Sequence, residues 1–186
     1  MQTYSQKVPN LAVDETLEQC LETNVRFARR YLRSHGALNL MFVGYAPNSE
    51  VVCLQPQVDA ATDKDRMVEL VRQLFVAHDV LRYCVLSEAW MSRNVDSMPS
   101  QSPDRVEVLL VTVGDAEQDL SALCRMQRNA RGKLLRVDDP DVADGRLVEG
   151  RFTRLLHPSG PAGEEVLREA KSLARRFGVG VRTYLH

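Results

Sequence analysis

Two long apolar runs joined by a polar loop constrain the fold of this chain more than any other feature. Residues Tyr83–Met91 form the first run and Asp104–Val113 the second. Their length, and their content of β-branched and aromatic residues, are typical of buried strands, whereas the loop Ser92–Pro103 is long for a hairpin connection. Carboxylates interrupt both runs, at Glu88 and Glu107. We therefore expect two neighbouring strands with charge on an otherwise buried surface.

The register of these two strands decides which chemistry they could support. Pairing that is symmetric about the loop places Glu88 opposite Glu107 and Trp90 opposite Arg105. Opposed carboxylates are unfavourable unless a cation or a shared proton relieves them, so this register predicts a metal site or an acid–base pair. A shift of two residues instead places Arg105 opposite Glu88, as an ordinary ion pair that Trp90 partly covers. We favour the ion pair, because the loop does not fix the register.

The order of elements predicts an α+β fold, with one mostly antiparallel sheet and about three helices packed on it. Helical spacing of apolar residues predicts a helix that Asp14 caps and that ends near Ser34, a second over 63–79, and a third from Pro161 to Phe177. The remaining predicted elements are strands over 38–45, 50–55, 119–127, 133–137, 146–156 and 179–185. By element order alone, the chain is similar to the roadblock and profilin-like modules, an analogy of topology that carries no function.

Length and composition are those of an ordinary soluble domain. The 186 residues, 44% of them hydrophobic, predict one domain over 1–186, with residues 1–13 as a loose N-terminal leader. No segment has the apolar length of a membrane span or of a signal peptide, so a cytoplasmic location is expected. Cys20, Cys53, Cys84 and Cys124 are far apart and lack metal-ligand spacing, which indicates reduced, buried thiols.

A basic hairpin is the one candidate for binding nucleic acid. Arg125, Arg128, Arg131 and Lys133 surround the predicted turn Asn129–Gly132. Such a tip can contact phosphates, but only one aromatic residue is nearby and acidic residues follow directly. Since the chain has a net charge of -1, we do not expect nucleic acid to be its main partner.

Known catalytic motifs are absent from the sequence. No phosphate-binding glycine loop, nucleophile elbow or zinc-binding helix motif occurs, and the four histidines lie in separate segments. The acidic stretch Asp138–Gly145 has the wrong spacing for a calcium loop and predicts a plain turn. We therefore predict no cofactor, no metal and no catalytic residue, with Glu88 and Glu107 as the only weak catalytic candidates.

One segment resembles known sequences. Ser87–Met91, the loop after it and Pro103–Val108 are similar to a segment of uncharacterised bacterial and phage proteins. The resemblance brings no activity with it and implies a prokaryotic cytoplasmic setting.

The leading functional hypothesis is a non-enzymatic module that acts through protein contacts. We expect a protein partner or a homodimer, with the sheet edge or the first helix as interface. The first alternative is a small-molecule or metal-dependent site on Glu88, Glu107, Arg105 and Trp90. Hydrolysis is one activity that such a site could have. The second is nucleic-acid binding by the basic hairpin. A concave pocket around the first set would favour a ligand site.

Overall fold

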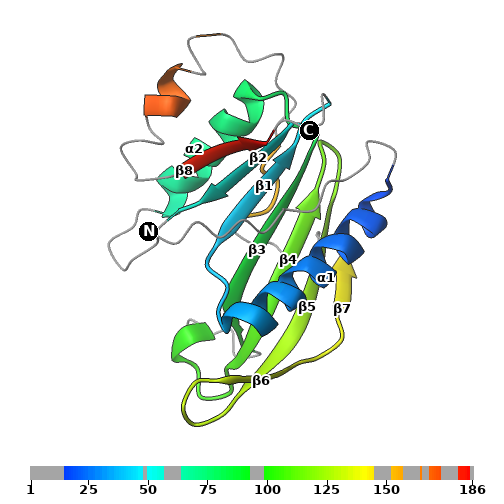
Figure 1. The fold of residues 1–186 in the computed structure, drawn as a ribbon, viewed down its shortest axis with the longest axis vertical. Coiled ribbons are helices and arrows are strands. Elements are labelled where there is room, and N and C mark those ends of the chain that lie inside the picture. Colours follow the sequence, from blue (N-terminus) through cyan, green and yellow to red (C-terminus); the bar gives the residue numbers. More distant parts are fainter. Residues whose placement is uncertain are drawn as a thin grey trace.

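The fold is described from a computed structural model. It describes residues 15–47, 50–56, 64–92, 99–144, 152–156, 164, 168–172 and 180–184. Within these ranges the architecture is α+β, with an antiparallel sheet between helices, as the order of elements predicted (Figure 1).

Eight strands make up the sheet, in the order β6-β5-β4-β3-β1-β2-β8, and β7 pairs with β5 beside β6. The strands are β1 (Met41–Tyr45), β2 (Val51–Gln55), β3 (Arg82–Met91), β4 (Val106–Gly114), β5 (Asp119–Arg128), β6 (Leu134–Val137), β7 (Asp141–Asp144) and β8 (Gly180–Tyr184). All of the described pairings are antiparallel. A short 3-10 helix, η1 (Pro99–Gln101), lies in the loop between β3 and β4.

Helix α1 (Leu17–His35) packs along one face of the sheet, against β3, β4, β5 and β6. Thr16 caps it in a capping box with Gln19, and Gly36 ends it in the left-handed conformation with a φ of 78°. The predicted cap, Asp14, lies outside the described residues, and the observed cap, Thr16, lies two positions after it. The buried side of α1 joins one of two core clusters, with Leu86, Leu109 and Cys124 from the strands among its members.

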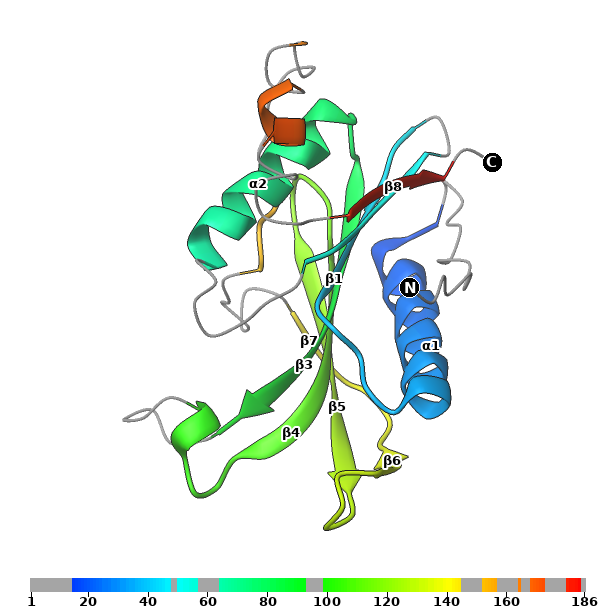
Figure 2. The ribbon, with the colours of Figure 1, turned by 60° about the vertical axis from the view of Figure 1, so that its left-hand side comes forward.

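The opposite face of the sheet is covered by α2 (Lys64–Ala77), as the turned view shows (Figure 2). A second core cluster fills this side, where Leu74 and Phe75 of α2 pack with Phe42, Tyr83 and Val85 of the strands. Residues 164 and 168–172 are helical, in agreement with the third predicted helix as far as it is described. The sheet is therefore buried on both faces, which explains why its central strands are nearly continuous apolar runs.

Two of the predicted elements differ in the structure. The stretch predicted as a plain turn contains β7, because its backbone pairs with β5 from Leu120 to Leu123. A strand was predicted over 146–156, yet residues 152–156 form none, and Leu155 packs into the α2-side core instead. The part of that prediction before residue 152 lies outside the described residues. Apolar periodicity alone did not distinguish a strand from a buried loop here.

The cysteines are in the state that their spacing in the sequence predicted. All four cysteines are free and buried. Burial raises the pKa of Cys20 to about 12, so this thiol stays protonated and unreactive at neutral pH. No helix among the described residues is long and apolar enough to cross a membrane.

Candidate functional site

The register of β3 and β4 differs from both alternatives that the sequence left open. Trp90 pairs with Glu107, and Glu88 pairs with Leu109. Glu88 and Glu107 are thus diagonal neighbours on the α1 face rather than directly opposed. Arg105 comes before the first paired residue of β4 and faces neither carboxylate. The prediction of a Glu88–Arg105 ion pair is therefore wrong.

The cation that relieves the two carboxylates is Arg128, at the end of β5. Its Nε donates to both carboxylate oxygens of Glu107 at 3.1 Å, and its Nη2 donates to Glu88 Oε2 at 2.9 Å. Its Nη1 donates to the carbonyl oxygens of Gly36, at 2.7 Å, and Gly132, at 3.1 Å. The guanidinium thus joins three strands to the end of α1 and to the β5–β6 turn. We refer to Glu88, Glu107 and Arg128 as the Arg128 cluster.

The Arg128 cluster is mostly withdrawn from solvent. The side chains of Arg128, Glu88 and Glu107 are 17%, 23% and 20% exposed. Burial raises the pKa of Glu88, against the opposing effects of the Leu38 N–H, which donates to Glu88 Oε1 at 2.6 Å, and of Arg128. Both oxygens of Glu88 accept a hydrogen bond, and Glu107 is held by the Nε of Arg128. The geometry is that of a structural ion network, with its polar atoms already in use.

The other residues of the predicted ligand site are also engaged. The Arg105 guanidinium lies over the Trp90 ring, 5.0 Å from its centroid, and donates to the Ser100 carbonyl oxygen at 2.6 Å. Trp90 is 44% exposed, so the pair forms a rim beside the cluster and not the wall of a described hollow. The structure brings Trp90 and Glu107 together but leaves Arg105 out of the carboxylate cluster.

The four cations predicted to bind nucleic acid do not share one surface. Arg128 is bound in the cluster, and Arg125 is exposed on the opposite face of β5 from the buried Cys124 and Met126. Arg131 lies in the turn after β5, a turn that the Asn129 side chain organises by accepting from the Arg131 and Lys133 N–H groups. Lys133 faces a hollow between β6 and α1.

A neighbouring hollow lies further along α1, toward the start of the helix, and we refer to the two hollows together as the α1–β6 groove. The hollow nearer the start of α1 has a volume of about 300 Å³ and is lined by Glu22, Val25, Arg26, Arg29, Arg30, Arg33 and Pro140. The second, of about 270 Å³, is lined by Leu32, Arg33, Gly36 and residues Lys133–Val137. Arg33 lines both hollows, so they meet at this side chain.

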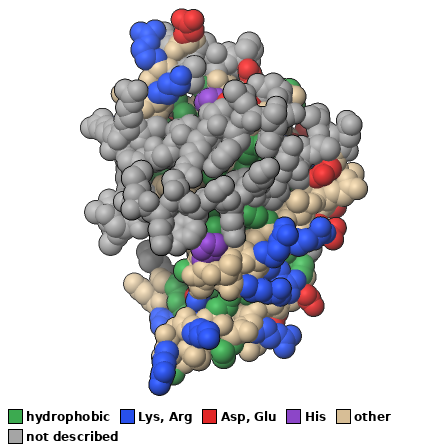
Figure 3. All heavy atoms as spheres, viewed as in Figure 1, with side chains coloured by type: hydrophobic (Ala, Val, Ile, Leu, Met, Phe, Trp, Pro, Cys, Tyr) green, Lys and Arg blue, Asp and Glu red, His purple; other side chains and the backbone are tan. Residues whose placement is uncertain are grey.

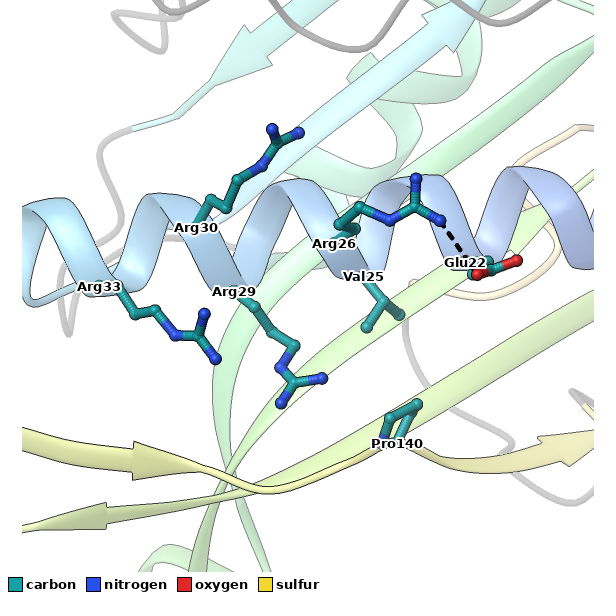
Figure 4. A pocket seen from close by; sticks show the side chains of 7 residues that line it. All are labelled: Glu22, Val25, Arg26, Arg29, Arg30, Arg33 and Pro140. Carbon is teal, nitrogen blue, oxygen red and sulfur yellow. Dashed lines mark hydrogen bonds and ion pairs between the residues drawn. The ribbon is translucent and has the colours of Figure 1, made fainter.

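Figure 4 shows how the side chains of the first hollow lie. Arg29, Arg33 and Val25 point from α1 toward the segment that carries Pro140, whereas Arg30 extends to the other side of the helix. The face seen in Figure 3 carries Lys and Arg side chains along α1 and below it. The first helix and the β6 segment, which are far apart in sequence, thus form one basic surface.

Only part of this positive charge is compensated. Arg26 pairs with Glu22 at 3.0 Å, Arg29 with Asp139 at 3.1 Å, and Arg136 with Asp138 at 2.6 Å. Arg29 also donates to the Val137 carbonyl oxygen at 3.1 Å, which holds β6 to the helix. Among the described residues, the side chains of Arg30, Arg33 and Lys133 have no hydrogen-bond or ion-pair partner.

The sequence predicted the sheet edge or the first helix as an interface, but not that the two together form this groove. It placed Lys133 in the basic hairpin, and the arginines near the end of α1 also suit the helix dipole without any ligand. A signal was present, because Arg26, Arg30 and Arg33 recur at helical spacing on the exposed side of α1. Only the packing of α1 beside β6 puts the two basic segments together.

Searches for relatives add no function to this geometry. No protein-family model matches the chain, and no curated protein and no solved structure matches it either. The likeness to roadblock and profilin-like modules therefore remains an analogy of element order. Within the described part of the chain, no group of three or more His, Cys, Asp or Glu side chains could hold a metal ion.

Proposed function

We propose that the protein is a non-enzymatic interaction module that binds another protein chain at the α1–β6 groove. The observation that carries the proposal is the set of cations without partners, Arg30, Arg33 and Lys133, beside two adjoining hollows. Surface cations that serve only stability need no concave setting, whereas binding sites are usually concave and combine apolar walls with a few polar groups. The groove has both, because Val25, Leu134 and Pro140 lie among its cations.

The edge of the sheet adds to this support. Strand β6 is the last strand at its end of the sheet and pairs only with β5 among the described strands. An edge strand carries backbone groups that a second chain can pair with. Here the edge lies beside the groove, where one of its carbonyl groups already accepts a hydrogen bond from Arg29.

The carboxylate pair gives less support to a catalytic function. A general acid or base needs a proton-transfer position that a substrate can reach. Both oxygens of Glu88 already accept hydrogen bonds, and Arg128 occupies the space between the carboxylates where a cation or a substrate would have to lie. The ligand-site alternative would require this network to open.

Site-specific photo-crosslinking in cells tests the proposal. A benzophenone amino acid placed at Leu135, which is 64% exposed and lines the groove, is compared with one at Leu81, which is 53% exposed and precedes β3. We expect a discrete protein adduct from position 135, which charge reversal of Arg33 and Lys133 removes. An adduct of twice the mass of the chain would identify the partner as a second copy, a result that light scattering of the purified protein would check.

Two results would contradict the proposal. The first is the absence of any adduct at position 135. The second is an adduct that forms equally from positions 81 and 135 and that ignores the charge reversal. Either result would mean that the groove does not mediate specific protein contacts.

A further inference from the structure

We propose that the α1–β6 groove recognises a short acidic segment of its partner that also carries apolar side chains. This inference rests on the proposed function and names the chemistry of the partner. It follows from the position of the uncompensated charge, from the exposed leucine beside it, and from the acidic residues at the other end of the groove.

The uncompensated charge lies at one end of the groove. Arg33, from α1, and Lys133, from the β5–β6 turn, line the same hollow from opposite sides. Arg30 lies one turn before Arg33 on the helix and lines the adjoining hollow, although its guanidinium extends to the other side of the helix (Figure 4). A carboxylate placed between the two sides would meet cations from both, and a guanidinium binds a carboxylate with well-defined geometry.

An apolar contact point lies within this basic end. Leu135 is 64% exposed and lines the hollow, with Lys133 and Arg136 close to it in sequence. Isolated exposed leucines are common, but one inside a concave basic site can be covered by a ligand. We therefore expect an apolar residue of the partner to cover Leu135 while its acidic neighbours contact the cations.

The opposite end of the groove argues against a nucleic acid. Glu22 lines the first hollow, and Asp139, which pairs with Arg29, is 93% exposed beside it. A continuous phosphate backbone would pass these carboxylates. Single-stranded nucleic acids also use aromatic side chains for stacking, and none line the two hollows. A short acidic segment that contacts only the basic end of the groove avoids this repulsion.

Fluorescence anisotropy with synthetic probes tests the inference on the full-length protein. The probe is a short labelled peptide of alternating glutamate and leucine. Three related probes separate its features: a glutamine–leucine peptide, a glutamate–serine peptide and oligothymidylate. We expect the glutamate–leucine peptide to bind more tightly than the other three, and its affinity to fall as salt screens the cations.

Paired charge reversals locate the binding. Arg33→Glu with Lys133→Glu reverses one cation on each side of the groove, and we expect a loss of affinity of at least about tenfold. The matched control, Arg125→Glu with Arg131→Glu, makes the same change of net charge outside the groove, and we expect less than about a threefold change. Leu135→Ser should reduce the affinity for the glutamate–leucine peptide by about fivefold and leave the affinity for the glutamate–serine peptide unchanged. Circular dichroism melts check that each variant is folded.

Several results would overturn the inference. If the control reversal weakens binding as much as the groove reversal does, the binding is nonspecific charge attraction. If the glutamine–leucine peptide binds as tightly as the glutamate–leucine peptide, recognition of acidic residues is excluded. Tighter binding of oligothymidylate, lost in the groove reversal, would make nucleic acid the occupant. If the crosslink at position 135 forms but no acidic peptide binds, this inference fails and the proposed function stands; if neither occurs, both fail.

Discussion

Two regions of this molecule place cations next to carboxylates, and they do so with opposite results. In the Arg128 cluster, one guanidinium serves two carboxylates and two carbonyl groups, and all three side chains are mostly buried. In the α1–β6 groove, the cations outnumber their partners, and Arg30, Arg33 and Lys133 remain exposed without one among the described residues. The difference indicates that the cluster contributes to the stability of the fold, whereas the groove is available for binding.

The Arg128 cluster and the α1–β6 groove are built from the same segments. Strand β5 ends in Arg128, and the turn after it presents Lys133, while α1 presents Arg33 to the groove and the Gly36 carbonyl to Arg128. The cluster therefore holds the walls of the groove in place. Mutations should separate these roles, since a buried charge affects the free energy of unfolding and an exposed one affects mainly binding.

Arg128→Met should give the largest effect. Methionine retains much of the aliphatic stem but leaves two mostly buried carboxylates without their cation, so we expect a loss of about 3 kcal/mol in the free energy of unfolding. Urea denaturation measures this loss. The triple variant with Glu88→Gln and Glu107→Gln should recover most of it, because the repulsion is removed with the charges. A loss below about 0.5 kcal/mol for Arg128→Met would show that the cluster is not structural.

Glu88→Gln should have a smaller effect that depends on pH. Burial raises the pKa of Glu88 above its ordinary value of 4.5, so the folded state binds this proton more tightly than the unfolded state does. Stability from this group therefore increases as the pH falls from neutral through the raised pKa, and it decreases as the pH rises. Glutamine does not titrate, so the stability advantage of the wild type over the variant should grow toward acid pH.

Urea titrations of the wild type and of Glu88→Gln at several pH values between about 4 and 7 measure this difference. At neutral pH we expect the variant to lose about 1 kcal/mol in the free energy of unfolding. Arg128 still pairs with Glu107, and only its hydrogen bond to residue 88 changes from a charged to a neutral acceptor. A difference that stays constant over this range, or that shrinks toward acid pH, would mean that the carboxyl group is not held in the buried setting described above.

Replacing both Arg30 and Arg33 by glutamine should have the smallest effect on stability. These side chains are exposed near the C-terminal end of α1, where a cation interacts with the helix dipole by only a few tenths of a kcal/mol. We therefore expect a loss below about 1 kcal/mol in the same urea assay. A loss as large as that of Arg128→Met would show that the groove cations, like Arg128, are structural.

Most of the fold could be predicted from local patterns. The apolar periodicity of α1 and α2, the glycine that ends α1, and the Asn129–Gly132 turn each depend on residues close in sequence. Strand β7 was missed because its residues Asp141 and Asp144 have low β propensity. Its position is set by pairing with β5, and that is a tertiary contact.

The candidate site was less predictable than the fold. The two apolar runs that carry Glu88 and Glu107 could be recognised as neighbouring buried strands from the sequence alone, because they have the length and the residue types of strands. That the cation beside these carboxylates is Arg128 and not Arg105 depends on tertiary contacts, since the long loop leaves the register open and burial of the strands sets it. Likewise, the arginines of α1 and the lysine after β5 are each visible in the sequence. They become one basic groove because α1 buries its apolar side against the sheet and so places its exposed arginines beside β6.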